Sequence, residues 1–265
     1  MTKLTIGNTI NIAWGVYRDR FKEYYRLAFI NSFWIFVPVY GWAKYAAMMG
    51  LLARLAYYDV VGNAETVTEA KRHIKPKTWF FFGAGLMASL IFYLKLVLFL
   101  LLILILFFLA HSNLFSITIS FILIFIGPTY YFYWLRARLF LYELPLAIEQ
   151  NINATKSRDI SWDLVTGSIF PIQVIIFCFS TFFGVLFIPI ISSASVLYNL
   201  FINPFADFLN SNIILDFFSD TICIIFVVAF NALFIPFWQL LKAVTYYQLN
   251  LLSKSEADTL GLDRN

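Results

Sequence analysis

Leu96 to Leu109 reads LVLFLLLILILFFL, fourteen consecutive residues without a polar side-chain atom, and this stretch decides the fold class. With its apolar flanks it exceeds the ~20 residues that cross a ~30 Å hydrocarbon layer. Lipid offers no hydrogen-bond partner to backbone amides, so a crossing segment must be a helix or a strand of a closed barrel. The run is continuously apolar and lacks the alternation of a barrel strand, which favours a helix.

The composition of the whole chain indicates a membrane environment, because 61% of its residues are hydrophobic and only 13% are charged. Soluble domains have roughly 45–50% apolar and 25% charged residues. We therefore expect an all-α integral membrane protein with six transmembrane helices, in a single polytopic membrane domain over residues 1–252 and a short cytoplasmic C-terminal tail over 253–265. The first two segments are short and broken by Pro38 and Gly41, which leaves either full spans or a re-entrant pair. The six apolar segments are 24–37, 42–58, 79–110, 115–142, 167–197 and 213–247.

Lysine and arginine are distributed unevenly between the connections of these segments. They occur in the N-terminal arm, at 71–77, at 156–158 and after the sixth segment, whereas the connections 111–116 and 198–212 contain neither. Because cytoplasmic loops carry the excess of Lys and Arg, both termini are predicted to be cytoplasmic. The expected location is a cytoplasmic (bacterial inner) membrane or a thylakoid membrane. The net charge of +4 is explained by these flanks, so no nucleic-acid partner is expected.

An internal repeat links the inner ends of two segments. Residues 53–59 (ARLAYYD) recur as 137–143 (ARLFLYE), and the offset of 84 residues also carries Ala70 onto Ala154 and Gly83 onto Gly167. A weaker third copy at 242–249 (KAVTYYQL) keeps a tyrosine and an amide but lacks the arginine. We interpret the chain as three pseudo-repeats, each an interfacial helix followed by two spans.

A short amphipathic stretch precedes each pair of spans. In the first, apolar residues recur at helical spacing over 6–21. In the second, Thr66 and Glu69 have the spacing of a capping box at a helix start. In the third, Lys156 and Arg158 can reach lipid phosphates from an interfacial helix.

The repeated motif contains the main candidates for a ligand site. Arg54 and Arg138 each stand four residues before a tyrosine and five before an acid, near the cytoplasmic end of a span. Two arginines on pseudo-symmetric helices are suited to grip a lipid or substrate phosphate, with the tyrosines orienting them. The alternative is structural, in which each arginine pairs with the neighbouring carboxylate and with headgroups. The tyrosines and acids of the two copies are Tyr58, Asp59, Tyr142 and Glu143.

Lys95 is exceptional because it lies near the middle of the third segment. A lysine at the bilayer centre costs about 2.5–3.5 kcal/mol, while each apolar residue contributes roughly 0.3–0.6 kcal/mol in favour of insertion. The side chain either faces a polar cavity or anionic ligand, or snorkels to the cytoplasmic interface. Nearby, Arg136 is interpreted as a headgroup anchor, and the aromatic run 130–134 as the wall of a site only if it faces a cavity.

Groups with catalytic or metal-binding potential are few. His73 and His111 fall on opposite sides of the membrane in this topology, so they cannot share a metal or form a proton relay. The sequence has no Gly-rich phosphate loop, nucleophile elbow or His-Glu-x-x-His zinc helix. We expect no catalytic residue, no metal and no cofactor, and therefore a non-enzymatic protein.

Residues 142–149 (YELPLAIE), followed by Ala154, Ser157 and Gly167, resemble the membrane domain attached to some bacterial glycerophosphodiester phosphodiesterases and its stand-alone relatives. The resemblance extends over most of the chain and implies a six-span helical protein with interfacial helices. It does not imply the diesterase activity, because the chain contains neither the soluble hydrolase barrel nor its paired His and acidic residues.

These observations predict a multi-pass membrane protein that acts as a scaffold or accessory subunit of a membrane complex and organises lipids. Its expected partners are membrane lipids and other membrane proteins. The alternative is a transporter or lipid-handling permease, suggested by the repeat and by Lys95, Arg54 and Arg138.

Overall fold

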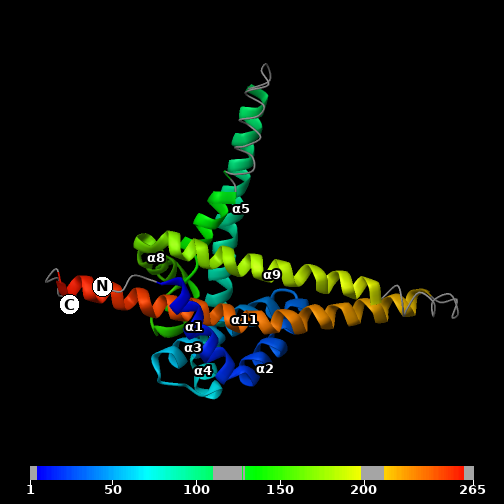
Figure 1. The fold of residues 1–265 in the computed structure, drawn as a ribbon, viewed down its shortest axis with the longest axis horizontal. Helices are drawn as coiled ribbons and strands as arrows, with labels where there is room; N and C mark the ends of the chain where they lie inside the picture. Colours follow the sequence, from blue (N-terminus) through cyan, green and yellow to red (C-terminus); the bar gives the residue numbers. More distant parts are fainter. Residues whose placement is uncertain (1–4, 110–126, 128, 198–211, 260–265) are drawn as a thin grey trace.

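The computed structural model describes residues 5–109, 127, 129–197 and 212–259, which form helices and turns without a strand (Figure 1). The prediction of an all-α chain is confirmed. A further helical stretch covers residues 129–138. The elements in chain order are α1 (Ile6–Asp19), α2 (Phe21–Ser32), η1 (Phe33–Phe36), α3 (Tyr40–Val61), α4 (Val67–Ile74), η2 (Lys75–Lys77), α5 (Thr78–Leu109), α7 (Glu143–Ile148), α8 (Ala154–Val165), η3 (Thr166–Ser168), α9 (Ile169–Leu197) and α11 (Asn212–Thr259).

A base of packed helices surrounds α3, which contacts α2, α5, α7 and α11. Leu51, Leu52 and Leu55 of α3 are fully buried there. The same core reaches α1 through Ala13 and α8 through Val165. Removal of this apolar surface from water is the main force that holds the base together.

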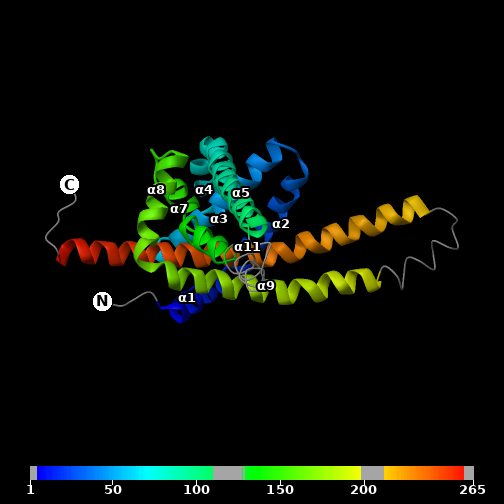
Figure 2. The ribbon, with the colours of Figure 1, turned by 90° about the horizontal axis from the view of Figure 1, so that it is seen from above.

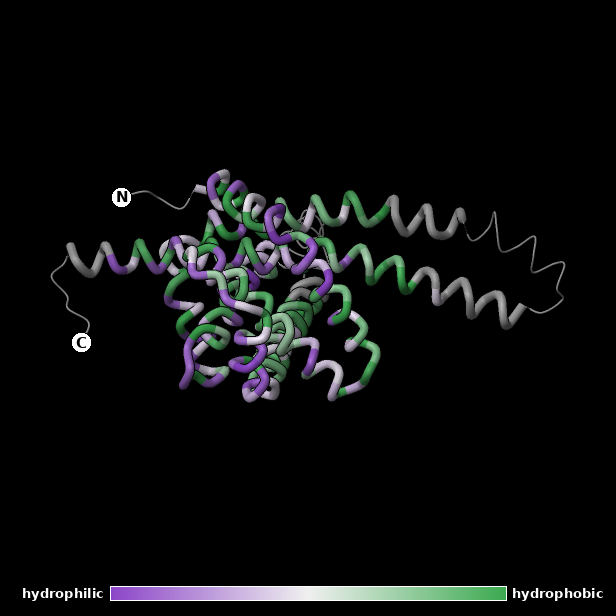
Figure 3. The backbone as a smooth tube through the Cα atoms, turned by 90° about the horizontal axis from the view of Figure 1, so that it is seen from below, coloured by the Kyte–Doolittle hydropathy of each residue, from purple (hydrophilic) through white to green (hydrophobic). Residues whose placement is uncertain are grey.

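Two arms extend from the base in different directions (Figures 1 and 2). One arm contains α5 and residues 129–138, and the other contains α9 and the N-terminal half of α11. Figure 3 shows that the described part of the α9–α11 arm is mainly hydrophobic, whereas most hydrophilic segments lie in the base. Helix α5 of the other arm is apolar by sequence, since residues 96–109 carry no polar side chain. The chain therefore separates a polar-edged base from two apolar arms.

Three described helical stretches are long and apolar enough to cross a membrane: Val67–Leu102, Ala154–Ile188 and Ile224–Lys254. They correspond to the third, fifth and sixth predicted segments; of the fourth, 115–142, the structure describes residues 127 and 129–142. The first two segments form the α2–η1–α3 hairpin, and most of the second half of α3 is buried within the base. Six spans are therefore not established by the described structure.

The helix α11 is much longer than a bilayer requires. Its 48 residues span about 70 Å at 1.5 Å per residue. It runs from the second arm through the base and continues to Thr259, past residue 252. Pro236 lies inside it, and the Tyr17 hydroxyl of α1 donates a 2.6 Å hydrogen bond to the nearby Leu233 carbonyl. Burial raises the pKa of Tyr17 to about 12, so this phenol remains a donor at neutral pH.

Phenylalanines join the two helices of the second arm. Phe183 of α9 lies 5.8 Å from Phe230 and 5.2 Å from Phe234 of α11, measured between ring centroids. Phe187 extends the contact, at 5.7 Å from Phe230. Such aromatic pairs give association beyond their burial alone, which explains how two apolar helices stay together without polar contacts between these rings.

Local signals at the helix ends explain where α3 stops and α4 starts. Gly62 has φ 84°, the left-handed conformation that terminates a helix, and Asn63 N donates to Tyr58 O at 2.9 Å. The predicted capping box is confirmed: Glu69 N donates to Thr66 Oγ1 at 3.3 Å, and Thr66 N donates to Glu69 Oε2 at 3.0 Å. The turn and the cap bring α4 back along α3.

The repeat is not confirmed at the residue level. Ala70 is fully buried in the middle of α4, whereas Ala154 is the first residue of α8 and only partly buried. Gly83 lies within α5, but Gly167 lies in η3. The segments α4–η2–α5 and α8–η3–α9 do share one order of elements, since each has a short helix, a 3₁₀ turn and a long apolar helix.

The crossing of α3 and α5 generates a prediction, because Gly50 leaves space for the ring of Phe81. A Cβ atom at Gly50 would lie 2.3 Å from Phe81 Cε1, and this ring is 2% exposed. We expect Gly50→Ala to lower the free energy of unfolding in mild detergent by about 1–3 kcal/mol through overpacking.

The matched control is Gly83→Ala in α5, where an added Cβ meets no atom within 4 Å. Alanine there is expected to be neutral or slightly stabilising, because it favours the helix. Phe81→Leu should restore part of the loss in the Gly50→Ala background. Equal effects of the two alanine substitutions would contradict the close crossing.

Candidate functional site

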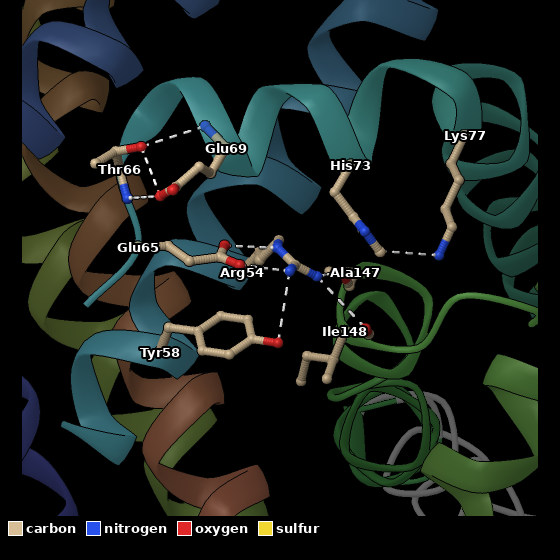
Figure 4. A network of polar contacts seen from close by, with 9 residues as sticks. All are labelled: Arg54, Tyr58, Glu65, Thr66, Glu69, His73, Lys77, Ala147 and Ile148. Atoms are coloured by element: carbon tan, nitrogen blue, oxygen red, sulfur yellow. Dashed lines mark hydrogen bonds and ion pairs between the residues drawn. The ribbon is translucent and has the colours of Figure 1, made fainter. Parts of the chain in front are cut away.

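The Arg54 side chain is the centre of a buried polar network at the junction of α3, α4 and α7 (Figure 4). Its Nε and Nη2 donate to the two carboxylate oxygens of Glu65 at 2.7 and 2.6 Å. Its Nη1 donates to the carbonyls of Ala147 at 2.9 Å and Ile148 at 3.4 Å. The remaining contact is with Tyr58, whose hydroxyl lies 3.5 Å from Nη2. These five bonds match the five donors of a guanidinium.

Lys77, the last residue of η2, completes the same network. Its Nζ donates to the carbonyls of Leu146, at 3.1 Å, and Glu149. It also lies 3.4 Å from His73 Nε2. The last carbonyls of a helix have no intrahelical donor, so the two cations satisfy the C-terminal end of α7 in the interior of the base.

Asp59 belongs to a separate cluster between α3 and the α1–α2 junction. It accepts a hydrogen bond from Arg20 and a 2.7 Å bond from the Tyr24 hydroxyl. Burial tends to lower the pKa of Arg20, but the hydrogen bonds and charges of Glu23 and Asp59 outweigh it and raise the pKa. Asp59 is therefore the partner of Arg20 and not, as predicted, of Arg54.

Glu143 pairs with the last long helix. Its Oε2 accepts from Lys242 Nζ at 2.8 Å and from Gln239 Nε2 at 3.0 Å. Burial tends to raise the pKa of Glu143, but the Lys242 charge and the hydrogen bonds from Lys242, Gln239 and Tyr142 hold it below the ordinary value. The carboxylate is thus charged at neutral pH, and its cation comes from α11 and not from Arg138.

Arg138 has no carboxylate partner among the described residues. Its Nη1 donates to the Trp162 carbonyl at 3.0 Å and to Thr166 Oγ1 at 2.6 Å. The guanidinium carbon also lies 4.9 Å from the ring centroid of Trp162 and 5.5 Å from that of Trp134. The buried Nε has no hydrogen-bond acceptor. This arginine therefore ties residues 129–138 to α8 and η3.

The structure does not bring Lys95, Arg54 and Arg138 together. Lys95 is exposed on α5 and lines neither of the two cavities described below. Arg54 faces the end of α7 and Arg138 faces α8. A phosphate site built from both arginines is not what the geometry favours, because their hydrogen-bonding groups serve different helices.

A cavity of about 450 Å³ lies beside the Glu143–Lys242 ion pair, between α5, residues 132–143, α9 and α11. We call it the Arg136 cavity. Phe132 lines it, so one residue of the aromatic run 130–134 does form the wall of a cavity. Its polar or charged lining residues are Ser89, Tyr93, Arg136, Tyr142, Glu143 and Lys242.

A second cavity, of about 520 Å³, lies between α1, α9 and α11. It differs in chemistry, because aromatic and aliphatic residues such as Trp14, Phe179 and Phe237 line it and no charged residue does. It offers nothing to hold an anion, so the Arg136 cavity is the stronger candidate for a specific ligand site.

Several residues of these clusters were not identified from the sequence. Lys242 carried a usable signal, because a lysine within the sixth apolar segment needs a partner in the same way as Lys95. Glu65, Lys77 and Gln239 carried none, since their partners lie across tertiary contacts. Among the described residues, no group of three His, Cys, Asp or Glu side chains is placed to hold a metal.

Comparison with models of protein families, with curated proteins and with solved structures gives no match for this chain. The resemblance to the membrane domain of the glycerophosphodiester phosphodiesterases therefore stays a prediction.

The Arg54 network predicts a specific loss of stability. In Arg54→Gln the Glu65 carboxylate loses its cation and the α7 carbonyls lose their donor. We expect the free energy of unfolding in mild detergent to fall by about 3 kcal/mol, the lower end of the range for breaking a buried ion pair, because Glu65 keeps some contact with solvent. Arg54→Lys should recover only part of the lost stability, because an ammonium cannot form the two parallel hydrogen bonds to the Glu65 carboxylate.

Arg72→Gln on the exposed side of α4 is the control, with an expected change within about 0.5 kcal/mol. Chemical denaturation followed by tryptophan fluorescence measures all three variants. A loss in Arg72→Gln as large as in Arg54→Gln would show that charge alone, and not the network, stabilises the base.

Proposed function

We propose that this protein is a multi-pass, non-enzymatic component of a cytoplasmic or thylakoid membrane that acts as a scaffold or accessory subunit and organises lipids. In this proposal the chain crosses the membrane six times, and both termini and the basic loops are cytoplasmic.

The apolar surface of α5 is the observation that carries the proposal. None of the 18 residues in its most hydrophobic window is buried within the chain. Leu90, Leu94 and Leu98 lie one helical turn apart and are 64%, 58% and 57% exposed. An apolar face of this length needs cover from lipid or from other membrane helices.

The charged residues of the base support a structural role. Arg54, Asp59 and Glu143 are each bound by other side chains of the same chain. These ion pairs join α3 to the loop before α4, α3 to the α1–α2 junction, and α7 to α11. Groups used in this way hold helices in place and have little free capacity for acid–base chemistry.

A lipid-handling permease is the second candidate. The Arg136 cavity favours it, because a cavity of this volume with both apolar and charged lining residues, where α5 leaves the base, can hold part of an amphiphile. The first candidate is preferred, because the residues of the repeated motif serve contacts within the chain.

The proposed topology makes a direct prediction for thiol labelling. In a Cys178→Ala, Cys223→Ala background, single cysteines replace Ser112, Asn210 or Arg72. A membrane-impermeant maleimide should label residues 112 and 210 in intact cells, and residue 72 only after permeabilisation, because the basic loops stay inside. Labelling of residue 72 from outside, or protection of residue 112, would overturn the six-span topology.

The scaffold role predicts that a partner protein covers α5. Leu94→Trp with Leu98→Trp keeps the face apolar, so lipid can still cover it, but the added bulk disrupts a fitted helix contact. In mild detergent the wild-type protein should elute as a complex with a second membrane protein, and the double variant should elute without it.

Val185→Trp, on an exposed position of α9 in the other arm, is the matched control and should keep the complex. Size-exclusion chromatography with light scattering gives the masses. A wild-type protein that elutes alone, or a double variant that retains its partner, would refute the scaffold role of this face.

A further inference from the structure

Arg136 places an uncompensated cation in the Arg136 cavity. Among the described residues no carboxylate forms an ion pair with it, and its identified contact is the ring of Phe132, 5.1 Å from the guanidinium carbon. The side chain is exposed and lines the cavity. Its donors are therefore open to a ligand.

The other charges of the cavity balance one another. Glu143 is bound to Lys242 at 2.8 Å, and Gln239 supplies a second donor at 3.0 Å. The lining therefore keeps one net positive charge, carried by Arg136. A buried ion pair beside an open arginine favours an anion as ligand and disfavours a cation, because only the positive charge lacks a partner.

The walls of the cavity are suited to the apolar part of the same ligand. Phe92 and Tyr93 of α5 and Trp238 of α11 line it together with Phe132. Ser89, one turn before Tyr93, offers a hydroxyl on the same side of α5. A charged end with aromatic walls matches an amphiphile whose headgroup meets the arginine and whose glycerol and chains continue along the rings.

We infer that the Arg136 cavity binds the headgroup of an anionic membrane phospholipid, with the guanidinium of Arg136 on the phosphate. Guanidinium binds phosphate with two parallel hydrogen bonds, which an ammonium cannot reproduce. This inference rests on the membrane location proposed above. It goes beyond headgroup contact at the surface, because the ligand enters a defined cavity between α5, α9 and α11.

The test is titration of the full chain in mild detergent with phosphatidylglycerol, followed by native mass spectrometry. Arg136→Gln removes the cation, and Ala88→Phe fills the cavity from α5 while leaving every charge in place. Arg136→Gln should bind phosphatidylglycerol about tenfold more weakly than the wild type, the scale of one lost charge-assisted contact. Ala88→Phe should also bind about tenfold more weakly, because the added ring occupies the space of the ligand. Arg136→Lys should give a smaller loss.

Arg72→Gln removes an exposed arginine outside the cavity and is the matched control, expected to bind as the wild type. Glycerol 3-phosphate serves as a soluble competitor that separates a lipid from a free phosphate ester, and it should compete weakly because it lacks the chains. Unchanged binding in both Arg136→Gln and Ala88→Phe would overturn the inference. So would an equal loss in Arg72→Gln, or full competition by glycerol 3-phosphate at equal concentration.

The outcomes also separate this inference from the proposed function. Thiol labelling does not depend on Arg136, so a correct topology with unchanged lipid binding in both cavity variants shows that only the headgroup site is wrong. An inverted topology would instead contradict the proposed function, whatever the lipid titration shows.

Discussion

The buried guanidinium of Arg54 is the contact on which the base depends most. It joins α3, the loop that leads into α4, and the end of α7, three parts of the chain that come from both of its halves. A helix that ends inside a packed interior leaves carbonyls that no water can satisfy, and each unmet group costs free energy. Arg54 and Lys77 meet this requirement together, so α7 can end among buried side chains.

The difference between local and long-range contacts explains why the candidate site differs from its prediction while the fold class does not. Apolar runs and helix signals are local, so the all-α class and the capping box at Thr66 could be predicted from the sequence. The ion-pair partners were not local: Glu143 and Lys242 are far apart in sequence, and only the packing of α7 against α11 brings them together.

One wrong partner could have been avoided by helical geometry. Successive residues of an α-helix turn by about 100°, so positions i and i+5 lie about 140° apart and face different sides. Arg54 and Asp59 have this spacing on one continuous helix, and accordingly Asp59 turns to Arg20. Tyr58, at i+4, does share the face of Arg54 and contacts it. In the second copy the helix ends at Arg138 and a turn follows, so the matching residues of the two copies do not make the same contacts.

The loss of equivalence between the copies also argues for different roles of the two arms at the base. In the first copy Arg54 is buried and Asp59 is bound by Arg20 at the α1–α2 junction, so the residues of this copy serve packing within the base. In the second copy the acid turns to Lys242 of α11, and Arg136 opens onto a cavity where the two arms meet the base. The cavity, and not the shared motif, is therefore where a difference in ligand would arise.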